Sequence, residues 1–210
     1  LIEQSAVVAR LFENDLKLIS NSRENSVIFF SEENTSTLYG YRYFDQVTER
    51  KLAAWFKWTL SGTIQYHCMQ DDFLYVVVRN NGKDQLLKYA IKIDSNTATV
   101  SEHRVHLDHL MSVTTAGNTY NINGQQKTTF DRPIGLENTT AQLAAFDIDS
   151  GTNLGRYGLI TQGVDGNGTP ILKVDGDWSG QTFMIGYLYT MEVAIPTIYY
   201  VTREGEGFRS

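Results

Sequence analysis

The densest group of residues that could hold a metal ion consists of Glu102, His103, His106, Asp108 and His109. Imidazole and carboxylate groups are common zinc ligands, and on a helix three histidines spaced three apart would face the same side. No fourth ligand follows at a recognisable spacing, and the group lies where we place a domain boundary. An exposed connector accounts for these residues better than a metal site, and we predict no metal and no cofactor.

A second group of oxygen ligands lies in glycine-containing turns and comprises Asp165, Asn167, Asp175 and Asp177. Calcium-binding loops share this composition, but the closing Glu of the EF-hand pattern is missing and the flanking segments resemble strands rather than helices. Asp-Gly and Asn-Gly pairs are typical of hairpin turns. We therefore interpret these residues as turns.

Residues for catalysis are present without the spacing that catalysis needs. The acidic pairs Glu32-Glu33 and Asp71-Asp72 are sequence neighbours that point in different directions, whereas glycosidases hold two carboxylates roughly 5 to 10 Å apart. A strand would aim His67 away from Cys68, the single cysteine, which we interpret as a small buried hydrophobe. Neither a G-x-S-x-G elbow nor a phosphate-binding G-x-x-x-x-G-K-[ST] loop occurs. We predict that the protein is not an enzyme.

The composition indicates a globular protein rich in sheet. Of the 210 residues 41% are hydrophobic and 20% charged, and 12 Tyr and 10 Phe favour strands, whose pleated surface suits aromatic side chains. The net charge of −6 disfavours tight binding of nucleic acid, which needs Lys and Arg to displace counterions from phosphates. No apolar run approaches the roughly 18 residues that cross a bilayer, so we predict no membrane contact.

An internal repeat dominates the first half of the chain. Ser26 to Phe44 and Asp71 to Ile91 share an apolar strand, a polar turn with Asn and a second strand with tyrosine, offset by roughly 45 residues. Such periods are typical of β-propeller blades, so we predict partial blades over residues 1–112, the C-terminal part of a larger propeller. One short helix is predicted within Ile2 to Leu18, where apolar residues follow helical spacing.

The second predicted domain, residues 113–210, is β-sandwich-like. Its predicted strands recur about every 10 residues between Asp-Gly and Asn-Gly turns. The chain begins at Leu1 and stops at Ser210 without a closing strand, so we expect a piece of a larger protein in which this domain is truncated. The fold class is thus all-β.

Aromatic residues link the two copies of the repeat. In a strand, Trp55 would face one side while Phe56 and Trp58 face the other, and Tyr75 and Tyr89 stand in the second copy. We interpret these five residues as a structural seam between stacked sheets, because a strand that is apolar on both faces fits between two layers. The alternative is that exposed tryptophans stack on sugars or bases.

The order of these segments resembles tail tubular protein B, the tail nozzle family of short-tailed, podovirus-type bacteriophages. The resemblance is carried by the following segments: Leu38 to Phe44, the W-x-x-W block Trp55 to Trp58, Gly62, Asp72 to Asn80, Leu87-Lys88-Tyr89, Asp177-Trp178-Ser179-Gly180, Ile185-Gly186-Tyr187 and Glu192 to Tyr200. The tryptophan block and the Asp72 to Asn80 strand are the distinctive parts.

The resemblance implies a virion structural protein without a cofactor, made in the bacterial host cytoplasm and located in the virion tail. Nozzle proteins of this family are longer than this chain and form a hexameric ring from β-propeller and β-sandwich parts. The ring contacts a gatekeeper or adaptor tail protein and a tail fibre protein, seals the capsid, and lets double-stranded DNA pass during ejection. An acidic protein suits such a conduit because it denies phosphates their cationic partners.

Two other functions remain open from the sequence. One is a carbohydrate-binding or polysaccharide-degrading β-protein of a phage tail, which would need an exposed face on Trp55, Trp58 or Trp178 beside carboxylates. The other is a cellular propeller used for protein contacts. A predicted fold alone is weak evidence for either of these two functions.

Overall fold

The computed structural model describes residues 11–46, 49–92, 99–100, 103–116, 118–122, 124–148, 154–192, 199–201 and 207–209. Every regular element in these ranges is a β-strand and all neighbouring strands are antiparallel, so the all-β prediction is confirmed. The strands are β1 (Leu16–Ser22), β2 (Val27–Glu32), β3 (Thr37–Gln46), β4 (Glu49–Thr59), β5 (Thr63–Gln70), β6 (Phe73–Asn80), β7 (Lys83–Ala90), β8 (Thr99–Val100), β9 (His103–Arg104), β10 (Asp108–Thr114), β11 (Asn118–Ile122), β12 (Gln125–Asp131), β13 (Leu143–Asp147), β14 (Tyr157–Val164), β15 (Pro170–Asp175), β16 (Thr182–Tyr187), β17 (Tyr199–Val201) and β18 (Gly207–Arg209). The described residues contain no helix that could span a membrane.

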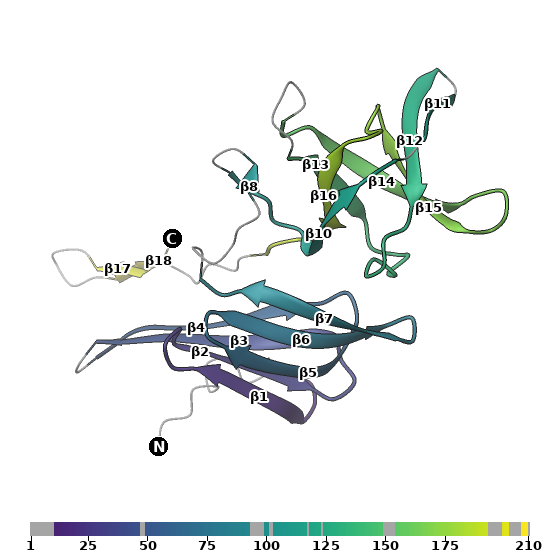
Figure 1. Cartoon of the computed structure of the whole chain (residues 1–210). Helices are drawn as coiled ribbons and strands as arrows, with labels where there is room; N and C mark the ends of the chain where they lie inside the picture. Colours follow the sequence, from purple (N-terminus) through teal and green to yellow (C-terminus); the bar gives the residue numbers. More distant parts are fainter. Residues whose placement is uncertain are drawn as a thin grey trace.

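Strands β1 to β7 form what we call the first module (Figure 1). The sheet β1-β2-β3-β4 packs face to face on the sheet β5-β6-β7. Alternation explains the packing, because every second residue of β2 and β6 is buried. The shared core consists of Val27, Phe29, Leu38, Leu60, Ile64, Leu74, Val76 and Val78.

The two copies of the repeat become hairpins in these two packed sheets. The hairpin β2-β3 lies in one sheet and β6-β7 in the other. Asn81 and Gly82 connect β6 to β7 with φ of 48° and 76°, the left-handed pair of a type I′ turn. The repeat therefore builds neighbouring layers, whereas their place in a propeller stays a prediction.

The second module is one seven-stranded sheet of order β10-β16-β13-β14-β15-β12-β11. Phe130 of β12 contacts Phe183 of β16 with ring centroids 5.5 Å apart, although three strands separate them in the sheet. Strands lie about 4.8 Å apart, so a flat sheet would keep these rings far from each other. The sheet therefore curls around a core that includes Leu143, Ile160 and Trp178.

The predicted N-terminal helix is wrong in its described part. Residues 11–15 are irregular and Leu16 already begins β1, while residues 1–10 lie outside the described ranges. Pairing of β1 with β2 overrides the helical spacing, and the Glu32 carboxylate accepts hydrogen bonds from the backbone N–H groups of Glu13 and Asn14 at 2.7 and 3.0 Å. The predicted division at residue 112 also stays a prediction, and β10 runs across it.

Candidate functional site

The two modules meet through a set of hydrogen bonds that we call the joint. Its residues are Ser61, Asn81, Lys83, Gln85 and Tyr89 of the first module and Asp108, His109, Gly135, Glu137 and Asn138 of the second. The first set lies in the β4-β5 turn and along β6-β7. The second set comes from the start of β10 and the loop between β12 and β13, two segments that the curled sheet brings together.

Glu137 is the most connected residue of the joint. Its carboxylate accepts hydrogen bonds from Lys83 Nζ at 3.1 Å, from Gln85 Nε2, and from the backbone N–H of Gly135 at 3.1 Å. Its backbone carbonyl accepts from Asn81 Nδ2 at 2.6 Å. The carboxylate side chain is 14% exposed, whereas Lys83 is 64% exposed. The shielded carboxylate therefore holds two side chains of the first module's β6-β7 hairpin, and the backbone carbonyl of Glu137 holds a third.

His109 links the modules through Nε2 of its ring, while Nδ1 binds within the second module. Nδ1 donates to the carbonyl of Gly135 at 3.2 Å, because a carbonyl can only accept, and in the neutral ring Nε2 accepts from the Ser61 hydroxyl at 2.6 Å. The backbone of His109 has φ of 51°, a left-handed conformation at the irregular step between Asp108 and Met111. This bulge turns the ring out of the β10 ladder and into the joint.

Two more hydrogen bonds complete the joint. Tyr89 donates to Asp108 Oδ1 at 2.8 Å, and burial together with this carboxylate raises the pKa of Tyr89 well above its usual range, so the phenol stays neutral and donates. Asn138 Nδ2 donates to the Ser61 carbonyl at 3.2 Å, while its backbone N–H donates to the Tyr187 hydroxyl at 2.9 Å.

The predicted connector with its histidines is thus only partly exposed. His106 is exposed, but His109 is buried, so the interpretation as an exposed connector is wrong for His109. Its ring is enclosed because both nitrogens have partners in the joint. Glu102 lies outside the described residues, as does the side chain of His103. Within the described ranges no three His, Cys, Asp or Glu residues are placed to hold a metal.

The aromatic residues of the predicted seam divide between the two faces of the β1-β4 sheet. Phe56 and Trp58 face the β5-β7 sheet, where Trp58 lies 5.9 Å from Tyr89 and 5.5 Å from Phe29. Trp55 faces the other way and contacts Tyr41 with centroids 4.8 Å apart.

Tyr75 points away from this core. It lies beside Phe73, whose ring carries Lys88 Nζ at 3.8 Å from the centroid. The structure therefore brings Phe56, Trp58 and Tyr89 together but not Trp55 and Tyr75. A role of the five residues between blades stays a prediction.

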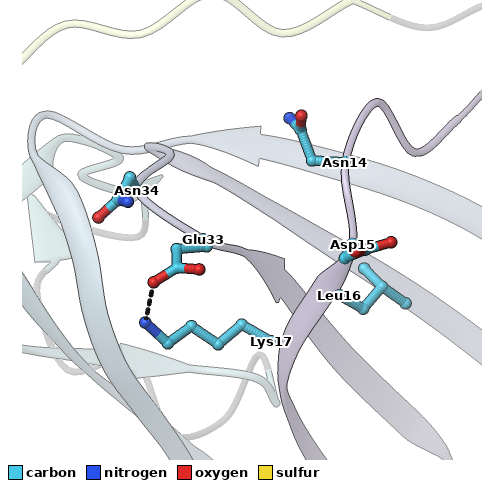
Figure 2. A pocket seen from close by; sticks show the side chains of 6 residues that line it. All are labelled: Asn14, Asp15, Leu16, Lys17, Glu33 and Asn34. Carbon is cyan, nitrogen blue, oxygen red and sulfur yellow. Dashed lines mark hydrogen bonds and ion pairs between the residues drawn. The ribbon is translucent and has the colours of Figure 1, made fainter.

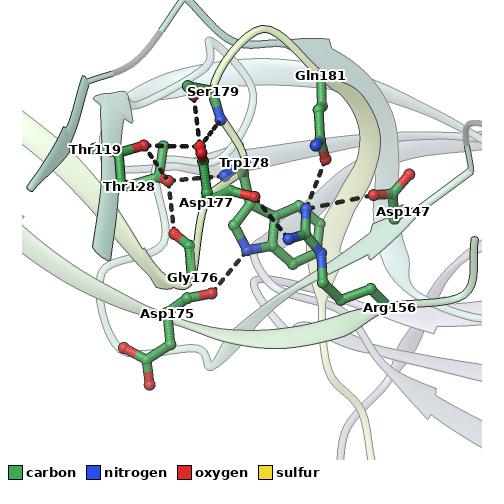
Figure 3. Close-up of polar contacts among 10 residues, drawn as sticks. All are labelled: Thr119, Thr128, Asp147, Arg156, Asp175, Gly176, Asp177, Trp178, Ser179 and Gln181. Atoms are coloured by element: carbon green, nitrogen blue, oxygen red, sulfur yellow. Dashed lines mark hydrogen bonds and ion pairs between the residues drawn. The ribbon is translucent and has the colours of Figure 1, made fainter. Parts of the chain in front are cut away.

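Trp178 anchors the loops at one end of the second module (Figure 3). It is fully buried, its indole N–H donates to the Asp175 carbonyl at 2.8 Å, and the Arg156 guanidinium covers one ring face at 3.8 Å. Gly158 leaves room for the ring, since a Cβ there would lie 3.2 Å from Trp178. The indole offers no face to a sugar.

The same loops account for two of the calcium candidates. Asp177 Oδ1 accepts from Thr119 at 2.9 Å and from the N–H and hydroxyl of Ser179 at 3.0 and 2.5 Å, which lowers the pKa of Asp177, the Ser179 hydroxyl contributing most (Figure 3). Asp175 pairs with Lys127 at 2.7 Å. The Asp177 carboxylate therefore stabilises a loop, and the Asp175 carboxylate joins β15 to β12.

The other two candidates, Asp165 and Asn167, lie in the β14-β15 turn. Asp165 accepts from the backbone N–H groups of Asn167 and Thr169, both at 2.8 Å. The prediction that these residues form a turn is confirmed.

The acidic pair Glu32-Glu33 is divided between a buried and an exposed position. Burial raises the pKa of Glu32, but hydrogen bonds from Asn14, Glu13 and Tyr39 outweigh it and lower the pKa overall. Glu33 lines an open depression with Asn14, Asp15, Leu16, Lys17 and Asn34 (Figure 2). There it pairs with Lys17 at 2.7 Å, and this hydrogen bond lowers the pKa of Glu33. Neither carboxylate is protonated near neutral pH, as a general acid must be.

His67 is the buried titratable group of the first module. Its ring contacts the hydroxyl of Ser20 through Nδ1 and that of Ser31 through Nε2 at 3.2 Å, and Cys68 points to the opposite face of β5, as predicted. Burial lowers the pKa of His67 to about 4, partly offset by a hydrogen bond to the Leu18 backbone.

Sequence reasoning did not find the joint. Glu137 and Asn138 stand in a loop without any motif. The sequence predicts turns at Ser61-Gly62 and Asn80-Asn81-Gly82, and it gives Ser61 and Asn81 no further role. The one available signal was the histidine group, which we interpreted as a connector. Contacts between distant segments carry no local spacing pattern, so the joint becomes visible only in three dimensions.

A comparison with models of protein families identifies a match. The family model described as bacteriophage nozzle protein matches residues 3–210. A search of curated proteins finds no match.

Proposed function

The chain belongs to the bacteriophage nozzle protein family, a structural component of the phage tail, and we propose that it forms part of a hexameric ring that seals the capsid and conducts the genome. The observation that carries the proposal is the family match over nearly the whole chain. Partners of the ring would be a gatekeeper or adaptor protein and a tail fibre protein. Double-stranded DNA would be a passing cargo rather than a bound ligand, which the net charge of −6 favours.

The first module supports a place within a larger stack of sheets. On the face of β5-β6-β7 turned away from the core, Tyr66, Val77 and Leu86 stand opposite one another on the three strands. Tyr66 and Leu86 are 55% and 69% exposed. An exposed apolar patch on the outer face of a sheet whose inner face is already buried is typical of a layer between two others, as in a propeller blade. We propose that this face contacts a further sheet in the assembled nozzle.

The carbohydrate hypothesis gains little from the structure. Trp178 is buried under Arg156, while Trp55 and Trp58 are partly buried among aromatic rings. Stacking on a sugar needs a free ring face beside a carboxylate, and none of these three rings is so placed. Titration of the tryptophan fluorescence with capsular polysaccharide tests this directly, and a saturable change would revive the hypothesis.

The experiment for the proposed function uses phage particles and the full-length protein. Antibody against this chain should label the tail below the capsid, and class averages of the purified protein should show a six-fold ring with a channel. Leu86→Glu should lower the yield of rings, whereas Ile134→Glu, at a 90% exposed position of the second module, should not. Label on the capsid shell instead, or a protein that forms no ring under any condition, would refute the proposal.

A further inference from the structure

The joint differs from the interiors of the modules in being polar. The core of the first module and that of the second share no residue, and no apolar cluster of the described residues contains members of both. The contacts across the joint are hydrogen bonds and one ion pair. We propose that the joint is a releasable clasp. In the closed clasp Glu137 holds the two modules at a fixed angle. When the hydrogen bonds of the joint break, the clasp opens and this angle changes while both cores stay folded.

The chemistry of the contacts supports release. Opening exchanges hydrogen bonds between side chains for hydrogen bonds to water, so its free-energy cost is far below that of separating two apolar surfaces. Gln85 contributes one donor to Glu137, but its Oε1 is buried and has no hydrogen-bond partner in the structure. Opening would hydrate this oxygen. A partly satisfied polar network of this kind holds less firmly than a complete one.

Backbone strain at His109 also favours opening of the clasp. A non-glycine residue with φ of 51° occupies a sparsely populated region, and such residues persist where their surroundings hold them. At His109 the surroundings include Ser61 of the other module. Release of the Ser61 contact removes one of the restraints on the strained residue, so strain favours the open state.

Glu137 is the residue on which closure depends, because it joins the hairpin of the first module through three side chains. Removing its negative charge weakens the contact with Lys83 and leaves the donors of Gln85 and Gly135 with a poorer acceptor. In a nozzle, a change of angle between modules would alter the width of the passage. That last consequence rests on the proposed function, whereas the clasp itself does not.

The test measures the distance between the modules in the 210-residue chain itself. In a Cys68→Ser background, cysteines replace Ile19 of the first module and Val164 of the second and carry spin labels. Both positions are exposed, at 66% and 60%, and neither belongs to the joint. The unmodified joint should give one narrow distance distribution by double electron–electron resonance. Glu137→Gln should add a second population and raise the ratio of open to closed molecules at least fivefold, with an unchanged circular dichroism spectrum.

Two further variants keep the inference testable if Glu137→Gln lowers stability. Asn81→Gly removes the amide that donates to the Glu137 carbonyl, keeps a residue suited to the left-handed turn, and should also enlarge the open population. Glu33→Gln removes an exposed carboxylate that pairs within the first module and should leave the distances unchanged. Unaltered distances in both joint variants, or a broad distribution before any substitution, would overturn the clasp. Neither result bears on whether full-length protein forms a ring.

Discussion

Acid should destabilise the first module through His67. Its side chain is 3% exposed between the two sheets of the module, with the hydroxyls of Ser20 and Ser31 at its ring nitrogens. A charged imidazolium at this position would lose its water without gaining a carboxylate partner. Burial lowers the pKa of His67 to about 4 because the charged ring is disfavoured by this loss of hydration.

The sign and size follow from linkage between folding and protonation. The unfolded chain takes up a proton at His67 near pH 6.5, while the folded chain does so only near pH 4, so between these values the unfolded state binds more protons. The loss of unfolding free energy caused by His67 is therefore nil above about pH 6.5, grows as the pH falls, and is complete near pH 4. A tenfold change in proton affinity corresponds to about 1.4 kcal/mol, so the whole loss is about 3 kcal/mol.

Urea denaturation at a series of pH values between 4.5 and 7.5 measures this loss. His67→Gln retains hydrogen-bonding groups for both serines but cannot titrate, so its unfolding free energy should fall less steeply between pH 6.5 and 4.5 than that of the unsubstituted chain. His106→Gln, at an exposed position, should keep the original slope. Parallel pH profiles for the unsubstituted chain and His67→Gln would refute the burial argument.

Three further predictions concern packing and buried polar groups, each measured as unfolding free energy by urea denaturation. Gly40→Ala places a Cβ against the ring of Phe56, which lies directly opposite, and should cost about 1–3 kcal/mol. Gly166→Ala, with open space around the new Cβ, should cost less than about 0.5 kcal/mol, and equal effects of the two substitutions would contradict the packing argument. Thr128→Val removes a buried hydroxyl that donates to the Gly176 carbonyl at 2.7 Å and accepts from the backbone N–H of Trp178 at 2.9 Å. This substitution should cost about 1–3 kcal/mol, while Thr114→Val at an exposed position should be near neutral. Glu32→Gln should flatten the loss of stability below about pH 4.5, because its lowered pKa makes the unfolded state bind the proton first; an unchanged profile would show that its hydrogen bonds do not favour the charged form.

Strands with alternating apolar residues could be predicted from the sequence, and polar strands could not. The sequence predicts strands at about Phe73 to Arg79 and Thr182 to Ile185. The observed strands β6 (Phe73–Asn80) and β16 (Thr182–Tyr187) begin at the same residues and end one and two residues later. By contrast β1 (Leu16–Ser22) and β11 (Asn118–Ile122) are edge strands rich in polar residues, and both were missed. Their identity comes from pairing with a neighbour, which local propensity does not encode.

Among the polar residues, those in local turns could be predicted from the sequence, and those in contacts between distant segments could not. Turn chemistry is local, so Asn81-Gly82 and the Asp165 turn were predicted correctly from a few residues. The joint depends on bringing residue 61 near residue 109 and residue 83 near residue 137. Spacing rules do not reach across such separations, and the strained backbone of His109 has no signature in its sequence.

The polar residues that first suggested chemistry serve architecture in this structure. Asp165 and Asp177 hold turns, Glu32 holds the segment before β1, and Asp108 and His109 hold one module against the other. Hydrogen bonds lower the pKa values of Glu32 and Asp177, so these two carboxylates are poor proton donors near neutral pH and therefore poor general acids. They are good structural acceptors, because a charged acceptor forms stronger hydrogen bonds than a neutral one. Acidic residues used as structural acceptors suit a structural component of a phage tail.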